Sequence, residues 1–139
     1  MRIMALDFGT KRIGIAVSDE LFITAQGLPS LYRKDLKSDL DEIGRIAKSN
    51  DVREIIVGLP LSMNGSYSAK TKEVVAFVDD LLKTVDIAVK TWDERLTSMQ
   101  AERVLLEADV SRSKRKKVTD KLAAQIILQS YLDSKGKKG

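Results

Sequence analysis

The chain has 139 residues, of which 43% are hydrophobic and 32% charged, and its formal net charge is +4. This length suits one hydrophobic core, so we expect a single domain over residues 1–139. The sequence contains no cysteine and no histidine, which excludes disulfides, thiolate nucleophiles, histidine-dependent triads and imidazole metal sites. A catalytic site would have to use carboxylates, hydroxyls, lysine, or a hard cation with oxygen ligands such as Mg²⁺ or Mn²⁺.

The first third of the chain predicts a hairpin followed by an edge strand. Two short apolar runs, residues 3–6 and 12–17, flank a glycine-containing turn over 7–11, which is typical of two antiparallel strands. A third strand is predicted over about 24–33. It contains Pro29, and because proline cannot donate a ladder hydrogen bond, we expect this strand at a sheet edge.

The middle of the chain alternates between helix and strand patterns. Apolar residues recur at helical spacing over 35–50 and again over about 74–82, while β-branched runs over 54–58 and 87–92 predict strands. Right-handed crossovers would make these later strands parallel. We therefore expect an α/β fold with a five-stranded mixed sheet: an opening antiparallel hairpin, an edge strand, then parallel strands, with helices on both faces.

The last third of the chain is predicted to be helical. Thr97 to Gln100 resembles a capping box that opens one helix, and a final helix is predicted over 118–134. Its buried face is expected to comprise Leu122, Ala123, Ile126, Ile127 and Tyr131. A short basic C-terminal tail, expected to be frayed, begins at about residue 135.

Basic charge is concentrated at the C-terminal end. Residues 1–110 carry 15 Lys and Arg against 18 Asp and Glu, whereas residues 111–139 carry 9 against 2. Five of the six residues over 112–117 are cationic: Arg112, Lys114, Arg115, Lys116 and Lys117. Such a density of charge attracts polyanions, although a solvated charged loop is the alternative interpretation.

Acidic residues stand where the predicted elements end or begin. Asp7 closes the first strand, Asp93 and Glu94 close the last strand, and Asp120 lies in the first turn of the final helix. Ligands of open α/β sheets gather beyond the carboxyl ends of the strands, so these acids could converge. Close carboxylates repel each other unless cations bind between them, which predicts two Mg²⁺ or Mn²⁺ ions roughly 4 Å apart.

Each acid also has a purely structural interpretation. Asp7 could hydrogen-bond a backbone amide of its turn, and Glu94 could pair with Arg95 or an exposed lysine. Asp120 could cap the last helix.

Four segments together resemble the YqgF-type family, which is described as Holliday junction resolvases and as nucleases for pre-16S ribosomal RNA. They are ALDFGTKRIGIAVSD at 5–19, IIVGLPLSMNGS at 55–66, TWDERLTSMQAE at 91–102 and DKLAAQIILQSYLD at 120–133. The resemblance implies a ribonuclease H-like fold and a metal-binding trio, which here would be Asp7, Glu94 and Asp120. Neighbours on a strand point to opposite faces, so Asp93 is the alternative to Glu94.

The activity that this resemblance implies is metal-dependent hydrolysis of phosphodiester bonds in structured nucleic acid. The expected substrate is the 5′ end of pre-16S ribosomal RNA, with Holliday junctions in DNA recombination and repair as the alternative. Whether the protein is a monomer or a homodimer stays open.

Several basic residues are candidates for phosphate contacts. Lys11 and Arg12 lie in the first turn, Arg95 follows the strand-end acids, and the basic residues over 112–117 would bind flanking phosphates without reading sequence. A polar turn over 64–68, followed by Lys70 and Lys72, is a possible substrate loop.

Two other classes of protein compete with a nuclease. Residues 7–10 also resemble the phosphate loop of sugar kinases and actin-like ATPases, but those proteins close two such domains over ATP. A non-catalytic nucleic-acid-binding module is the second alternative, and the presence of all three acids argues against it. Since no apolar stretch approaches the roughly 20 residues of a membrane span and no signal peptide pattern is visible, we expect a cytoplasmic protein with no membrane partner.

Overall fold

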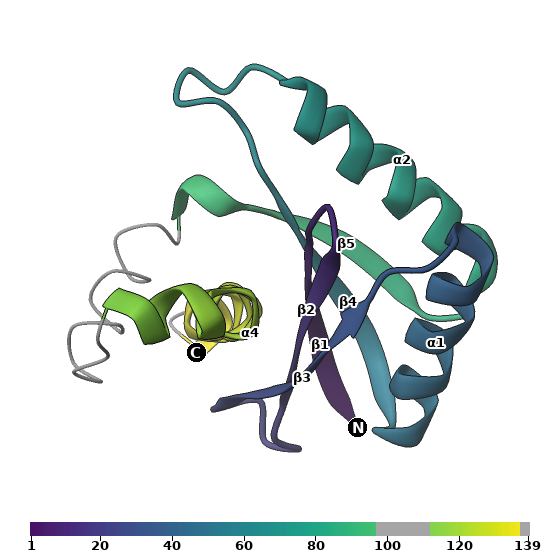
Figure 1. Ribbon diagram of the computed structural model, residues 1–139. Helices are drawn as coiled ribbons and strands as arrows, with labels where there is room; N and C mark the ends of the chain where they lie inside the picture. The colour runs from purple at the N-terminus through teal and green to yellow at the C-terminus, as the bar shows by residue number, and fades with distance from the viewer. Residues whose placement is uncertain (97–111, 137–139) are drawn as a thin grey trace.

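The computed structural model of the protein describes the chain over residues 1–96 and 112–136, with side chains over 1–96 and 122–135. A central sheet carries two helices on one face and a long helix on the other (Figure 1). The strands are β1 (Arg2–Phe8), β2 (Arg12–Ser18), β3 (Ala25–Tyr32), β4 (Val52–Leu59) and β5 (Ala88–Asp93). The helices are α1 (Leu36–Ser49), α2 (Ala69–Thr84) and α4 (Arg112–Gly136), and a 3-10 turn, η1 (Glu94–Leu96), follows β5.

The sheet has the mixed topology expected from the sequence. Its strand order is β3-β2-β1-β4-β5. The strands β1, β2 and β3 pair antiparallel, whereas β1, β4 and β5 run parallel. The strand that contains Pro29 is an edge strand, as predicted. Because β1 and β4 are central and covered on both faces, their residues form almost uninterrupted apolar runs.

Helices α1 and α2 cover one face of the sheet. The side chain of Asp35 caps α1 by accepting a hydrogen bond from the amide of Ser38, and Ser68 and Thr71 form a capping box at the start of α2. The apolar stripes of both helices pack on the sheet, and a cluster of buried residues joins them to it: Met4, Leu6, Phe8, Ile55, Val57, Leu40, Ile43, Val74, Phe77, Val78 and Leu81 among others.

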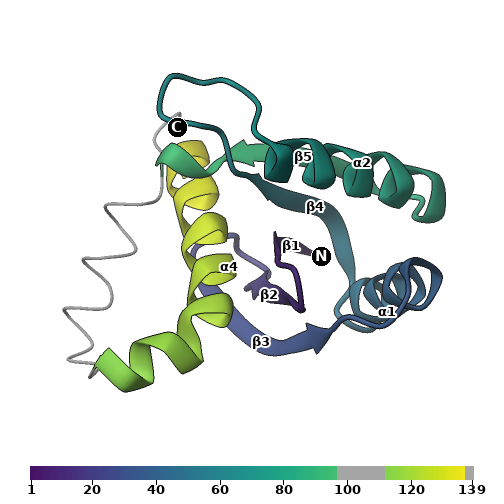
Figure 2. The same cartoon turned by 45° about the horizontal axis from the view of Figure 1, so that its top comes forward.

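Helix α4 covers the opposite face, as Figure 2 shows. The sheet presents the small side chains of Ala5 and Ala16 to the helix, and the helix presents Ala124, so the two layers approach closely. The prediction of the buried face is confirmed for Ile126, Ile127 and Tyr131. Leu122 and Ala123 are only half-buried, because the stripe is centred on positions 124, 127, 128 and 131, spaced i, i+3, i+4 and i+7.

The beginning of the last helix differs from the prediction. Helix α4 begins at Arg112, six residues before the expected start at residue 118. The basic residues over 112–117 therefore lie in its first turns and not in a loop ahead of it, because lysine and arginine are good helix formers. Position 120 is accordingly well inside α4 and not in its first turn, so the interpretation of Asp120 as a helix cap is wrong. The helix predicted to open at Thr97 lies outside the described residues, and α4 continues to Gly136.

A buried polar contact fixes the C-terminal half of α4. The hydroxyl of Tyr131 donates a hydrogen bond to the buried carboxylate of Glu54 on β4, and the ammonium of Lys90 lies 3.6 Å from the same carboxylate. Burial, followed by the interactions with Glu54, raises the pKa of Tyr131 to about 12. The long helix is thus anchored to β4 far from the carboxyl ends of the parallel strands. No helix in the described part of the chain is long and apolar enough to cross a membrane.

Candidate active site

The carboxyl ends of β1, β4 and β5 lie side by side at one edge of the sheet. In the ladder Leu6 of β1 pairs with Val57 of β4, and Gly58 pairs with Trp92 of β5. Asp7 is not in the turn that the sequence predicts, because β1 continues to Phe8 and Asp7 pairs with Gly14 of β2. Alternate residues of a strand share a face, so Asp7 lies on the same side of the sheet as Ile3 and Ala5, which is the α4 side.

Glu94 reaches back from η1 across β4. A Cβ atom placed on Gly58 would lie 2.7 Å from Oε1 of Glu94 and 2.6 Å from Cδ1 of Ile127. The glutamate side chain therefore occupies the space that a side chain at position 58 would need, next to α4. Because β5 ends at Asp93, Glu94 takes its direction from the 3-10 turn and not from strand alternation.

Asp7 and Glu94 face each other. Burial raises the pKa of Glu94 to about 8, with further contributions from the negative charge of Asp7 and a hydrogen bond between the two side chains, while the positive charge of Lys70 opposes them. A half-buried carboxylate pair of this kind either shares a proton or binds a cation.

Asp93, the alternative to Glu94, is engaged elsewhere. Its carboxylate accepts hydrogen bonds from Nε of Arg95 at 3.0 Å and from Nη2 at 2.6 Å. These hydrogen bonds with Arg95 lower the pKa of Asp93 below its ordinary value. Asp93 thus forms an ion pair with Arg95, while the side chain of Glu94 interacts with Asp7.

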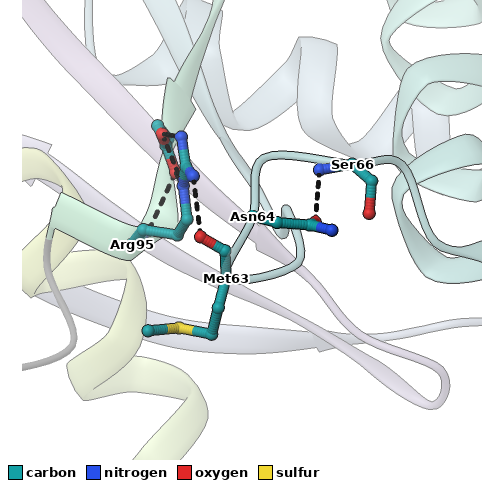
Figure 3. A network of polar contacts seen from close by, with 5 residues as sticks. Met63, Asn64, Ser66 and Arg95 are labelled. Atoms are coloured by element: carbon teal, nitrogen blue, oxygen red, sulfur yellow. Dashed lines mark hydrogen bonds and ion pairs between the residues drawn. The ribbon is translucent and has the colours of Figure 1, made fainter.

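Arg95 also ties the loop after β4 to the end of β5. Its Nη1 donates a hydrogen bond to the carbonyl of Met63 at 3.3 Å, and within the loop the side chain of Asn64 accepts from the amide of Ser66 (Figure 3). Gly65 has a positive φ of 84°, which glycine adopts without strain. A Cβ at this position would lie 3.3 Å from Nη1 of Arg95. The predicted polar turn is therefore a folded loop that packs against Arg95, the residue after Glu94.

The other predicted site residues are placed less completely. Lys11 is exposed at the tip of the β1–β2 turn, and the guanidinium of Arg12 lies 6.0 Å from the ring centroid of Tyr32. The side chains of Asp120 and of the basic residues over 112–117 lie outside the described side chains. Among the side chains that are described, no group of three or more acids is close enough to hold a metal ion.

Sequence reasoning missed two residues of this site. Gly58 was interpreted as the end of a strand, yet it lies within β4 and leaves the space that Glu94 fills. The sequence pairs Lys70 with Lys72, whereas in the structure the positive charge of Lys70 acts on Glu94. A glycine inside a β-branched run was the available signal, since such a position often marks a close approach by another group.

The acid pair predicts a pH-dependent stability in metal-free protein. The pKa of Glu94 is about 8 in the folded chain and has an ordinary value of 4.5, so between these values the folded state binds more protons than the unfolded state. The contribution of Glu94 to the free energy of unfolding is therefore at its full value below about pH 4.5. It should fall as pH rises toward 8, at up to about 1.4 kcal/mol per pH unit. Urea unfolding in EDTA at several pH values measures this slope. Glu94→Gln should flatten it, and an equal slope in both proteins would contradict the assignment.

Comparisons with known proteins identify the family of the chain. The model of the family described as "RuvX: Holliday junction resolvase" matches residues 1–134. The chain is 52% identical over 137 residues to a protein of Halothermothrix orenii named "Putative pre-16S rRNA nuclease", covering 99% of this chain and 98% of that protein. A protein of the same name from Desulforamulus reducens is 48% identical over 137 residues, covering 99% and 100%.

Solved structures share the fold at low sequence identity. The structure of T. thermophilus RuvC in complex with a Holliday junction substrate aligns with a TM-score of 0.59 at 12% identity, over 98% of this chain and 96% of that one. The complex of the Fowlpox virus resolvase with Holliday junction DNA aligns with a TM-score of 0.56 at 14% identity, over 96% and 98%. The ribonuclease H-like fold expected from the sequence is thereby confirmed.

Proposed function

Because the chain belongs to the RuvX Holliday junction resolvase family, we propose that it is a metal-dependent nuclease that hydrolyses phosphodiester bonds of structured nucleic acid. The observation that carries the proposal is the facing pair of carboxyl groups, Asp7 and Glu94, at the carboxyl ends of three parallel strands. Gly58 leaves the space for one of them.

The donor set fits a hard divalent cation. Asp7 and Glu94 offer only oxygen ligands. Burial, followed by the negative charge of Asp7, raises the pKa of Glu94, and a bound cation would stabilise both carboxylates. We propose Asp120 as the third ligand. Position 120 of α4 precedes Ala124 and Ile127 by about one and two turns, so the helical period puts these three positions on one face, and Ile127 lies beside Gly58 and Glu94.

In this proposal Asp7, Glu94 and Asp120 hold one or two Mg²⁺ or Mn²⁺ ions. Bound metal would activate an in-line water and stabilise the leaving 3′ oxygen, which leaves 5′-phosphate and 3′-hydroxyl ends. Glu94 must lose its proton before it can serve as a ligand, so metal affinity should rise with pH up to about 8. Arg95 holds Asp93 and the loop after β4 in place beside the ligands.

We assign the flanking phosphates to basic residues around this edge. Lys11 and Arg12 belong to the β1–β2 turn and Arg95 to η1, and the cationic residues over 112–117 begin the helix that carries Asp120. Contacts of this kind give affinity for any sequence and weaken with salt.

The substrate that we propose is the 5′ end of pre-16S ribosomal RNA, processed in the cytoplasm, since curated relatives near 50% identity bear that name over nearly their full length. A Holliday junction is the second candidate, because the family description names it. A resolvase cuts two strands symmetrically and is expected to be a dimer, whereas a trimming nuclease can act as a monomer.

Cleavage of the two substrates side by side tests the proposal. We expect purified protein to cut a pre-16S transcript with Mg²⁺ or Mn²⁺ and to be inactive in EDTA. Paired symmetric cuts in a four-way DNA junction by a protein of dimer mass would favour the second candidate. Binding without cleavage of either substrate, in any divalent metal, would leave a non-catalytic module.

A further inference from the structure

Lys70 lies in the first turn of α2, the helix that follows β4 in the chain. It is the second residue of α2 and lies in sequence between Ser68 and Thr71, which form the capping box of the helix. Thr71 is fully buried, and its hydroxyl donates a hydrogen bond to the carbonyl of Pro60, just after β4. The backbone at Lys70 is therefore fixed relative to the strand ends that carry Asp7 and Glu94.

The side chain of Lys70 is oriented in an unusual way. Lysines on a surface normally lay the aliphatic stem on apolar neighbours and keep the ammonium in water. Here 35% of the side-chain surface is exposed, yet the ammonium nitrogen has almost no exposed surface. It lies 5.1 Å from the ring centroid of Phe8, whose side chain packs with α1 and α2, on the face of the sheet opposite to Asp7.

The ammonium lacks a strong partner within the described part of the chain. None of the described residues accepts a hydrogen bond from Nζ of Lys70. The ammonium forms an ion pair with Glu73 at 3.8 Å, and the side chain of Glu73 is 63% exposed. An exposed pair at that distance contributes little. Covered donors without acceptors are costly and call for an explanation.

A phosphate that lies across this edge of the sheet, from the acid pair to the α2 side, would supply the missing acceptor once the flexible lysine side chain turns its ammonium away from Phe8. The charge of Lys70 acts on Glu94, so the ammonium lies within electrostatic reach of the proposed ligands. We infer that Lys70 is a substrate-binding residue whose ammonium binds a phosphate oxygen of the nucleic acid strand that enters beside Asp7 and Glu94. This inference rests on the proposed function. It gives Lys70 a role that Lys72, on the same helix, does not share.

Lys72 provides a matched control. It has the same charge two residues further along α2, and its side chain is exposed. Lys70→Met and Lys72→Met therefore remove equal charge from the same helical turn. Glu73→Gln removes the ion-pair partner of Lys70 and tests whether the lysine acts only through that pair.

The experiment measures binding of fluorescein-labelled probes to the full chain in EDTA, where cleavage does not interfere. The probes are a four-way DNA junction and an RNA hairpin with a single-stranded 5′ extension. We expect Lys70→Met to weaken binding about 10-fold, as for loss of a charge-assisted hydrogen bond, and Lys72→Met to weaken it less than about two-fold. Lys70→Arg should restore most of the affinity, and Glu73→Gln should not weaken binding.

The salt dependence separates a phosphate contact from a structural role. Loss of one phosphate contact lowers the slope of log affinity against log salt by about 0.7 to 0.9, which we expect for Lys70→Met. Equal effects of Lys70→Met and Lys72→Met, or the same loss with Glu73→Gln, would overturn the inference. If wild-type protein binds the probes through Lys70 but never cleaves them, the proposed nuclease activity is wrong and the phosphate contact of Lys70 still holds. Wild-type protein that binds neither probe would overturn both.

Discussion

Asp7→Asn is expected to lower the rate of metal-dependent cleavage by at least about 100-fold while the protein remains folded. Asparagine keeps the shape of the side chain but removes the charge that would hold the cation. The same change removes the negative charge that contributes to the raised pKa of Glu94, so metal-free Asp7→Asn protein should be no less stable than wild type. Single-turnover cleavage and urea unfolding in EDTA measure the two effects.

Neighbouring acids give this prediction its control. Glu94→Gln should abolish cleavage as Asp7→Asn does, because Glu94 faces Asp7. Asp93→Asn should be milder, since Asp93 is bonded to Arg95 and would lose only part of that contact. Cleavage by a folded Asp7→Asn protein at the wild-type rate would end the metal-ligand assignment. A larger loss for Asp93→Asn than for Glu94→Gln would exchange the roles of the two acids.

The fold could be predicted from the sequence where strong local patterns indicate the same topology. The apolar runs around the first turn, Pro29 in an edge strand and the alternation of strand and helix each indicate one arrangement, which the strand order confirms. The start of α4 was not accessible. Periodicity marks only the part of a helix that packs on a core, and the cationic residues over 112–117 show no apolar stripe and no breaker that would mark a boundary.

The sequence predicted which residue types form the site, but not where their side chains point. Acids at strand ends predicted convergence, and Asp7 and Glu94 do face each other. The turn that aims Glu94 back over β4 depends on a short 3-10 segment, for which sequence signals are weak. Likewise, the importance of Gly58 and Lys70 comes from atoms far along the chain, namely Glu94, Ile127 and Phe8. Such contacts exist only once the sheet has assembled.

Gly58→Ala should remove activity with only a modest loss of stability. The added Cβ would lie 2.7 Å from Oε1 of Glu94 and 2.6 Å from Cδ1 of Ile127. Both atoms are at the ends of flexible side chains, so they can move away, and overpacking of this kind costs about 1–3 kcal/mol. The movement displaces Glu94, and a misplacement of about 1 Å at a catalytic group can lower a rate about 100-fold.

Gly44→Ala is the matched control for that substitution. Gly44 lies in the interior of α1, and the nearest atom to an added Cβ is Cγ1 of Val85 at 3.9 Å, an ordinary contact. Alanine there should stabilise the protein by about 0.5–1 kcal/mol, because it restricts the unfolded chain, and should leave cleavage unchanged. Calorimetric titration with Mn²⁺ should show weaker binding for Gly58→Ala and wild-type binding for Gly44→Ala. Unchanged Mn²⁺ affinity and cleavage in Gly58→Ala would mean that Glu94 need not lie over β4 to act.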